Sequence, residues 1–199
     1  KPRVLDIGCG RANLLQQLNK LGCECYGIER AKCPSTSSMP RITIHHGSLE
    51  EKNFDNSYFD AVVIWHVLEH LHQPASTLDE IARITHQGGL LAIAVPNFSS
   101  FQSQLFKSNW FHLDLPYHLF HFSEEGLVRL LRKKGFKLRR VKRFHLEYSP
   151  FGWLQTLLNL SKIRFNLFYD LLKSGSLRRE KKEPLNIVGI FATLVLLPL

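Results

Sequence analysis

The chain has 199 residues, of which 44% are hydrophobic and 22% charged, a balance that excludes disorder along its whole length and suits one globular core with an appendage. Its four cysteines form no C-x-x-C pair and no signal-peptide pattern opens the chain, so we expect reduced thiols in a cytoplasmic protein. The net charge of +9 is unevenly distributed: residues 1–128 hold 10 basic and 13 acidic side chains, and residues 129–199 hold 16 basic and 4 acidic side chains. The basic second part favours an anionic partner, either nucleic acid or phospholipid headgroups.

The chain opens with the pattern of a strand, a glycine turn and a helix. The run "RVLDIGCG" (residues 3–10) is apolar, rich in branched residues and ends in glycines, which predicts a buried parallel strand entering a tight turn. Leucines at helical spacing in "ANLLQQLNKLG" predict a helix that ends at Gly22. "CECYGIE" then predicts a second strand ending at Glu29, and "RITIHHG" (41–47) a third. The polar segment between them holds two prolines, so its helix should be short or irregular.

The segment "WHVLEHLHQP" contains H-x-x-E-H, a spacing used by zinc peptidases when it lies on a helix. The preceding "FDAVVIW" predicts a strand, because β-branched residues lose side-chain freedom in helices. His66 therefore stands where a strand ends, and a zinc-peptidase helix cannot contain it. We expect no metal here, with Glu69 and His70 serving the start of a helix and its packing.

The later elements continue the alternation of strands and helices. Ser76 and Asp79 resemble a capping box for the helix "STLDEIARIT", which we expect Gly88-Gly89 to end. "LLAIAVPN" predicts a fifth strand, Ser123 is expected to cap the helix "EEGLVRLLRKKG", and "FKLRRVKRF" predicts a sixth strand. This alternation predicts an α/β fold, a doubly wound and mostly parallel sheet that binds ligands at the carboxyl ends of its strands.

The glycine turn lies at that edge of the predicted sheet. Gly8 and Gly10 let the backbone approach a ligand closely, and an acid such as Glu29 at the end of the second strand can bind ribose hydroxyls. An NAD-binding oxidoreductase shares both features, so these residues alone leave that alternative open.

Several motifs in the same order resemble the class I S-adenosylmethionine-dependent methyltransferases, in particular the bacterial type 11 and type 23-like domains. They are "VLDIGCGRANLLQQL", "YGIE", "FDAVVIWHVLEHL", "QGGLLAIAVPN" and "HLFHFSEEGLVRLLRKKGF". The resemblance implies a Rossmann-like fold and S-adenosylmethionine as the cofactor, with S-adenosylhomocysteine as its product. It implies cofactor-binding positions at Asp6, Gly8, Cys9, Gly10, Glu29, Ser48, Leu49 and Trp65.

Within that set, Asp6 and the glycines correspond to positions that contact the methionine end of the cofactor, and Glu29 to the acid that binds both ribose hydroxyls. Many relatives carry an acid after the third strand that faces the adenine amino group, and Ser48 stands there in this chain. Adenine contact should then rest on the backbone and on Leu49.

The methyl acceptor should lie over the ends of the fourth and fifth strands. A hydroxyl or amine acceptor needs a base, and His118, which corresponds to the histidine of the family's "PRHL", is the first candidate and His66 the second. Packed structural histidines remain the alternative. Tyr117 stands where relatives usually carry Arg. Candidate acceptor-binding residues are Asn97, Trp110, Tyr117 and His121.

The chain changes character after Glu147. "FGWLQTLLNLSKIRFNLFYDLLK" predicts amphipathic helices, and the final uncharged run of 15 residues is shorter than the roughly 20 needed to span a bilayer. We expect a methyltransferase domain over residues 1–147 and an apolar, basic helical extension over residues 148–199. One expectation is that the extension covers the substrate site or forms a homodimer contact. The alternative is that it lies on an anionic membrane surface. The chain also looks cut at both ends, before any seventh strand.

Together these observations predict methyl transfer from S-adenosylmethionine to a small-molecule acceptor, for which a lipid-linked compound is one candidate. No nucleic-acid partner is expected. We expect a cytoplasmic protein that can lie on the inner face of the membrane. Two alternatives stay open: the NAD-binding oxidoreductase, and a noncatalytic protein that binds the cofactor or docks on a membrane.

Overall fold

The computed structural model describes residues 1–30, 41–143 and 149–160. Two compact units make up the chain. Residues 1–97 and 116–139 form the first unit, and the second contains residues 98–115 together with the chain from Arg140 onward. The predicted helix around residues 31–40, and the parts of the C-terminal extension from residue 161 on, lie outside the described residues.

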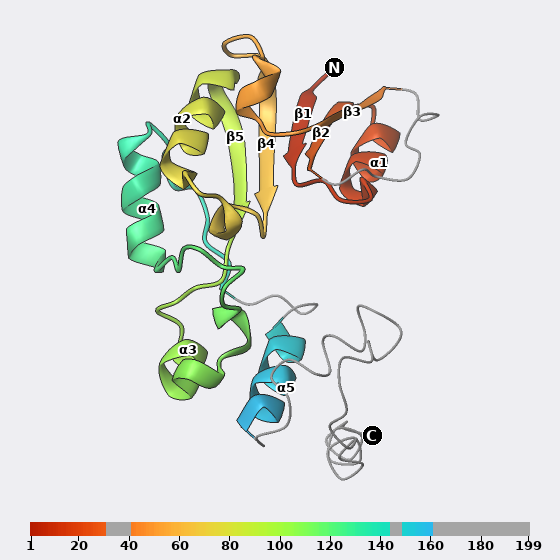
Figure 1. The fold of residues 1–199 in the computed structure, drawn as a ribbon. Coiled ribbons are helices and arrows are strands. Elements are labelled where there is room, and N and C mark those ends of the chain that lie inside the picture. The colour runs from red at the N-terminus through yellow and green to blue at the C-terminus, as the bar shows by residue number, and fades with distance from the viewer. Residues whose placement is uncertain (31–40, 144–148, 161–199) are drawn as a thin grey trace. The chain divides into compact units, whose positions relative to one another are not determined.

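The first unit is built on a five-stranded parallel sheet of order β3-β2-β1-β4-β5 (Figure 1). Its strands are β1 (Arg3–Ile7), β2 (Glu24–Glu29), β3 (Ile42–His46), β4 (Phe59–Trp65) and β5 (Thr85–Ala94). Each adjacent pair is parallel. The strand order reverses between β1 and β4, which is where ligands bind in doubly wound sheets. The predicted fold class is therefore confirmed.

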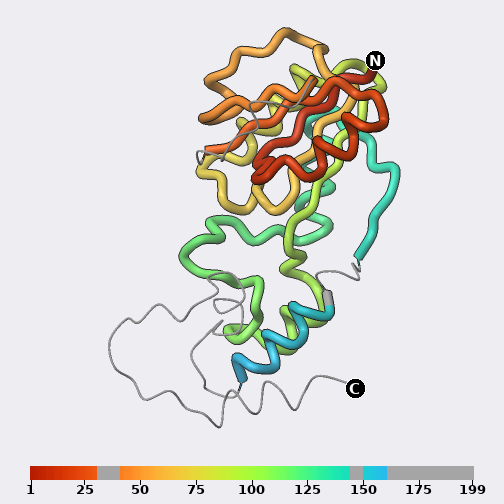
Figure 2. Tube along the Cα trace, turned by 90° about the vertical axis from the view of Figure 1, so that its right-hand side faces the viewer, coloured from red at the N-terminus to blue at the C-terminus, as the bar shows by residue number. Residues whose placement is uncertain are grey.

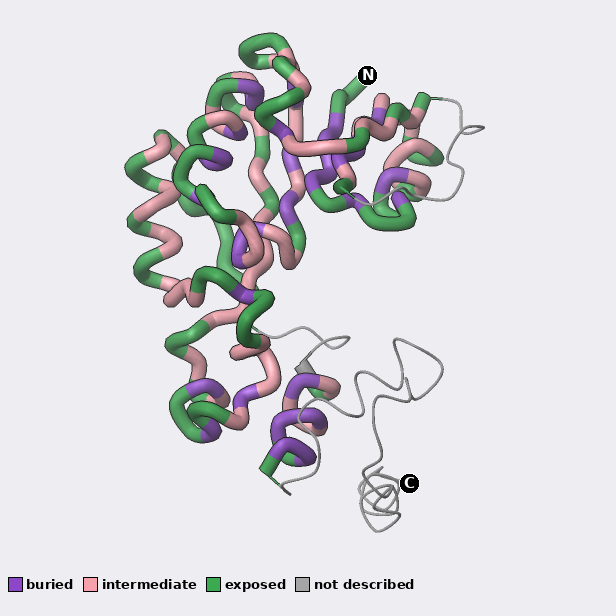
Figure 3. Tube along the Cα trace, in the orientation of Figure 1, coloured by how far each residue is buried: buried purple, intermediate pink, exposed green. Residues whose placement is uncertain are grey.

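Helices cover both faces of this sheet. On one face α1 (Asn13–Lys20) places Leu15 over the strands in a cluster with Cys9, Ala12 and Cys25. On the other face α2 (Pro74–Ile84) and α4 (Glu124–Lys133) pack over β1 and β4, with Leu78 and Ile81 fully buried. Figure 3 shows buried residues running along β1 and β4. Burial on both faces explains why these strands read as continuous apolar runs.

Two predicted boundaries of α2 are wrong. The helix begins at Pro74, not at Ser76, because proline fits the first helical turn, where no amide hydrogen is needed. It ends at Ile84, and Gly88 and Gly89 lie inside β5, where the pairing register with β4 shifts. The predicted cap of α4 is confirmed, since the Ser123 hydroxyl accepts the Gly126 amide hydrogen at 3.1 Å.

The predicted sixth strand is also wrong for residues 136–143, which form no strand. A strand needs a hydrogen-bonded neighbour, and β5 pairs only with β4 among the described residues. Phe136 packs against the main core, but the later apolar side chains of this segment, Leu138 and Val141, are exposed.

The second unit contains α3 (Phe101–Phe106), α5 (Ser149–Leu160) and short turns η3 (Lys107–Asn109) and η4 (Phe111–Leu113). Its interior is polar around Thr156, which is fully buried. The Thr156 hydroxyl donates to the Gly152 carbonyl at 2.6 Å and accepts from the Phe111 amide at 3.1 Å and from Gln102 Nε2 at 3.2 Å. These bonds hold α5 against residues 98–115.

Candidate functional site

The turn after β1 is held in place by the neighbouring strand. The amides of Gly8 and Cys9 donate to the Ile28 carbonyl at 2.8 and 3.1 Å. Both Gly8 and Gly10 have positive φ, at 76° and 51°, a conformation that favours glycine. A Cβ on Gly8 would clash with Cγ2 of Val67, whereas a Cβ on Gly10 would meet no atom within 4 Å. The turn therefore packs closely against the residue after His66 and is open at Gly10.

Two carboxylates flank this turn. Oε2 of Glu29, at the end of β2, accepts the Gly10 amide hydrogen at 2.9 Å. Asp6 is only 5% exposed, and its pKa is raised to about 6, first by burial and second by the nearby Glu29 charge. Such a pair favours a ligand that brings a cationic group and hydroxyl donors to the same turn.

The end of β3 carries an acid that the sequence analysis missed. The Ser48 amide donates to Oε2 of Glu51 at 2.9 Å. This is the reciprocal half of a capping box, and its signature S-x-x-E stands in the sequence at residues 48–51. The Leu49 side chain is buried in the main core rather than presented to solvent.

The end of β4 places a histidine and a buried glutamate together. The His66 amide donates to the Ala94 carbonyl at 2.9 Å, and the residue has a positive φ of 53°. Nδ1 of His66 lies 3.3 Å from Oε1 of Glu69, whose side chain is 1% exposed while that of His66 is 34% exposed. Trp65, the last residue of β4, is at the border of exposure at 36%.

A distant loop is fixed to this strand end. The Glu69 carbonyl accepts the amide hydrogens of Leu119 and Phe120 at 2.9 and 3.1 Å, and His70 Nδ1 donates to the Tyr117 carbonyl at 2.9 Å. Figure 2 shows residues 116–122 passing beside the turn after β4. His118 is thereby brought next to His70.

The rings of His118 and His70 have centroids 4.7 Å apart, and His121 lies 6.3 Å from His118 by the same measure. His118 is buried, at 8% exposure. One coordinating atom from each of Glu69, His70 and His118 lies within 4.8 Å of the others. The structure therefore gathers a carboxylate and two imidazoles at the end of β4.

The remaining predicted acceptor residues belong to both compact units. Asn97 forms an isolated bridge with Phe122, and Tyr117 is exposed. Trp110 belongs to the second unit, where it is 2% exposed and donates its indole N–H to Gln102 Oε1 at 3.2 Å. The hydrogen bond and the burial give Trp110 a packing role within that unit.

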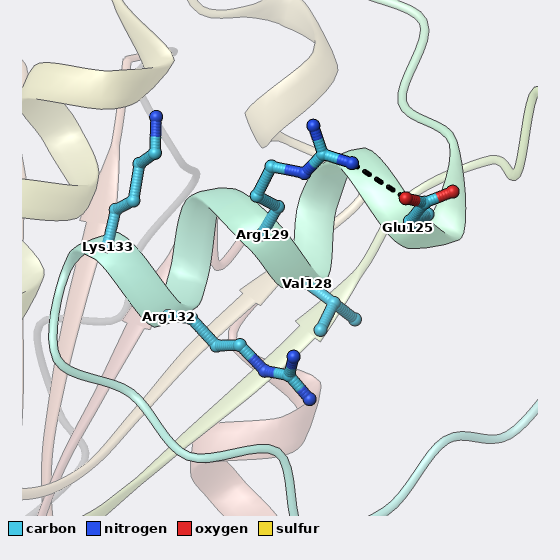
Figure 4. Close-up of a pocket in the computed structure, with 5 residues that line it drawn as sticks. All are labelled: Glu125, Val128, Arg129, Arg132 and Lys133. Atoms are coloured by element: carbon cyan, nitrogen blue, oxygen red, sulfur yellow. Dashed lines mark hydrogen bonds and ion pairs between the residues drawn. The ribbon is translucent and has the colours of Figure 1, made fainter.

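A basic hollow lies elsewhere, on the surface of α4 (Figure 4). Its lining residues all come from this one helix, and Arg129 forms an ion pair with Glu125 at 2.7 Å. Side chains from two or three turns of a single helix cannot enclose a ligand, so this hollow is a charged surface and not a second site. Its residues are Glu125, Val128, Arg129, Arg132 and Lys133.

The strand order, the glycine turn and the flanking acids define a Rossmann-like domain of the class I methyltransferase type. Residues 1–141 match the family model described as "Methyltransferase domain", and the chain belongs to this family. The resemblance found in the sequence is thus confirmed, and the ambiguity left by the glycine turn is resolved in favour of the methyltransferases.

Individual proteins support the same assignment. The chain is 30% identical to a ubiquinone biosynthesis O-methyltransferase of Maricaulis maris over 151 residues, which are 69% of this chain and 59% of that protein. A ubiquinone biosynthesis O-methyltransferase of Aromatoleum aromaticum is 32% identical over 112 residues, 52% of this chain and 47% of that protein. The chain thus spans about half the length of the curated relatives it matches.

Solved structures show the same fold. A SAM-dependent methyltransferase from Archaeoglobus fulgidus superposes with a TM-score of 0.57 at 22% identity, covering 83% of this chain and 80% of that one. No helix among the described residues combines the length and apolar character needed to cross a membrane.

Proposed function

We propose that this chain transfers a methyl group from S-adenosylmethionine to a hydroxyl group of an apolar small molecule. The observation that carries the proposal is the close approach of Gly8 to Val67, which places the turn after β1 directly against the residue that follows His66. A group bound at the turn and an acceptor beside His66 are then neighbours. Methyl transfer needs this proximity above all.

The residues around the turn fit the cofactor. The open space at Gly10 admits a ligand against the backbone, and Glu29 is placed to accept hydrogen bonds from ribose hydroxyls. Asp6 is a buried carboxylate that a cationic amino group would stabilise in its ionised form. S-adenosylmethionine, when bound, supplies a methyl group activated by a sulfonium. We place its adenine near the backbone of Ser48 and Leu49, where Glu51 contributes the acid.

His66 is the better of the two candidate bases. A neutral imidazole that donates Nδ1–H to Glu69 carries its lone pair on Nε2, and the carboxylate stabilises the imidazolium that forms when Nε2 takes a proton. The acceptor oxygen then forms a bond to the methyl carbon as the carbon–sulfur bond breaks, and its proton passes to His66. His118, which is more deeply buried and packs on His70, receives another role below.

The surroundings of His66 favour an apolar acceptor. Trp65, Leu119 and Phe120 are exposed large side chains on the segments that meet at the end of β4, and Tyr117 is exposed beside them. Exposed apolar side chains gathered at a strand end are typical of a binding site for an apolar ligand. Two curated relatives are named as O-methyltransferases of ubiquinone biosynthesis, and a lipid-linked phenol would suit both the base and these side chains.

Labelled methyl transfer tests this function. The chain is incubated with methyl-labelled S-adenosylmethionine and with lipid or aqueous fractions of a bacterial extract, and we expect label in phenolic lipids. The His66→Asn variant should keep its affinity for S-adenosylhomocysteine while losing most turnover, since a base acts on the transferring step. Equal turnover in the variant would refute the role of His66. Binding of NAD in place of S-adenosylhomocysteine would overturn the cofactor assignment, and bound cofactor that never turns over would indicate a noncatalytic protein.

We also propose that the chain binds anionic membranes through the basic segment of residues 126–143. A membrane-bound acceptor would require the enzyme to work at such a surface. Residues 126–143 contain nine basic and no acidic residues, and most are exposed. Each basic residue near an anionic surface contributes about 1 kcal/mol, a term that salt weakens. Sedimentation should therefore show binding to anionic but not to neutral vesicles, with loss at high salt; a chain that stays in the supernatant at low salt would contradict this. The homodimer stays a prediction.

A further inference from the structure

The cluster of Glu69, His70 and His118 has the composition of a metal site. One carboxylate and two imidazoles are ligands that zinc and related divalent cations prefer. Their coordinating atoms lie within 4.8 Å of one another. Ligand atoms about 2.0–2.1 Å from a tetrahedral zinc ion are roughly 3.3 Å from one another. Side-chain rotations that move the coordinating atoms by about 1 Å would therefore bring them to coordination distance.

The carboxylate of Glu69 is poised for such a ligand. Glu69 is 1% exposed, and its Oε2 is a buried oxygen with no hydrogen-bond partner, the one such side-chain atom found in the described ranges 1–30, 41–143 and 149–160. An unsatisfied buried acceptor costs about 1–3 kcal/mol, and more when it is charged. A bound cation would satisfy it while Oε1 keeps its contact with His66.

His70 is oriented as a ligand. A backbone carbonyl can only accept a hydrogen bond, so the 2.9 Å contact with the Tyr117 carbonyl fixes the proton on Nδ1. In the neutral ring the lone pair then lies on Nε2. Histidines that bind metals are commonly held in this way, with the second ring nitrogen bonded to a carbonyl or carboxylate.

The backbone fixes the third ligand. The backbone amides of Leu119 and Phe120 donate hydrogen bonds to the Glu69 carbonyl, and these two bonds hold residue 118 beside residues 69 and 70. All of these residues belong to the first compact unit. Backbone hydrogen bonds within this unit therefore hold the three ligands close together.

We propose that Glu69, His70 and His118 bind one divalent transition-metal cation, with zinc as the ion that fits them best. The proposal differs from the expectation of no metal at H-x-x-E-H. In it the motif supplies only Glu69 and His70, because Nδ1 of His66 contacts Glu69, and the third ligand comes from residue 118. Three protein ligands leave a fourth position open, and the net charge of the loaded site, +1 with neutral imidazoles, favours an anionic oxygen such as a phenolate. The site goes beyond methyl transfer and its test does not depend on it.

The test measures metal binding directly. Untagged full-length chain is stripped with a chelator, dialysed and titrated with Zn²⁺ against a competing indicator, and elemental analysis gives the stoichiometry. We expect one zinc per chain, and at least about 100-fold weaker binding in Glu69→Gln and in His118→Asn, since even the loss of a supporting hydrogen bond costs 10- to 100-fold. The exposed His72, two residues from His70, provides the matched control: His72→Ala should bind zinc like the wild type.

Two further measurements keep the result decisive. Cobalt in place of zinc should give the visible bands of a tetrahedral nitrogen and oxygen site without thiolate charge transfer, which excludes binding by the cysteines. Circular dichroism of each variant checks its fold, and His118→Asn decides if Glu69→Gln fails to fold. Absence of zinc from the wild type, or equal zinc affinity in His118→Asn, would overturn the proposal. Because the readout is binding, a failure of methyl transfer would leave this result intact.

Discussion

Burial of Asp6 makes the stability of the protein depend on pH in a direction opposite to that of most carboxylates. Its pKa is about 6 in the folded chain against 3.8 in the unfolded one, because burial and the Glu29 charge both disfavour ionisation. The folded state therefore binds a proton more tightly than the unfolded state. The contribution of Asp6 to stability is fully present below about pH 4 and is lost as the pH rises through 6.

The size of this effect follows from the two pKa values. A shift of one pKa unit corresponds to 1.36 kcal/mol, so the rise from 3.8 to about 6 corresponds to about 3 kcal/mol lost between pH 4 and pH 7. Asn cannot ionise, and Asp6→Asn should abolish this loss. Other carboxyls titrate in both proteins, including Asp60, whose pKa is lowered chiefly by the Arg3 amide, so the difference between the two proteins isolates Asp6.

The assay is urea unfolding of both proteins, followed by circular dichroism at several pH values. The wild type should lose about 3 kcal/mol relative to Asp6→Asn between pH 4 and pH 7, with little change on either side of that range. Saturating S-adenosylhomocysteine, which carries an ammonium group, should reduce the loss by favouring ionised Asp6. A stability difference that stays constant from pH 4 to pH 7 would refute the argument.

The remaining predictions concern the glycine turn, Glu29 and, in the second unit, Thr156. Gly8→Ala should destabilise by about 2–5 kcal/mol in urea unfolding, from its positive φ and the clash with Val67, whereas Gly10→Ala should incur only the φ cost; equal losses would contradict this. Glu29→Gln should weaken S-adenosylhomocysteine binding by about 1.5–3 kcal/mol, and calorimetry with unchanged affinity would displace the ribose site. Thr156→Val leaves two partly buried donors, the Phe111 amide and Gln102 Nε2, without their acceptor and should cost about 1–3 kcal/mol in unfolding, while Thr156→Ser, the control, should cost less.

The sheet could be predicted from sequence because its strands carry strong local signals. β1 and β4 are apolar and β-branched, since both faces of the sheet are covered, and such runs have few other uses in a soluble protein. The failures arose where two local rules compete. Gly88 and Gly89 look like a helix stop but belong to a bulge in β5, and Ser76 looks like a cap although Pro74 already starts the helix.

The approach of the residues around the glycine turn could be predicted from the sequence, whereas the approach of residues 116–122 to the end of β4 could not. Gly8 and Gly10 follow β1 and Glu29 ends β2, and these two strands are parallel neighbours whose carboxyl ends meet, so the spacing in the sequence predicts their approach. His118 reaches His70 through backbone hydrogen bonds to Glu69 across a separation of 48 residues, and no periodicity encodes such a contact. Aromatic character likewise does not reveal that Trp110 is buried within the second unit.

The two proposals meet at the carboxylate of Glu69. Oε1 lies 3.3 Å from Nδ1 of His66, the proposed base, and Oε2 has no hydrogen-bond partner. One carboxylate oxygen of Glu69 also lies within 4.8 Å of a ring nitrogen of His70 and of His118. A cation on Oε2 would withdraw negative charge from Oε1 and so weaken the stabilisation of the His66 imidazolium by Oε1. The same cation would lower the pKa of an acceptor hydroxyl that binds to the cation, so that a weaker base than His66 would suffice. Loss of turnover in Glu69→Gln is therefore ambiguous by itself. His66→Asn should lower turnover with zinc affinity retained, whereas His118→Asn should lower zinc affinity first, and turnover only to the extent that the cation takes part in the reaction.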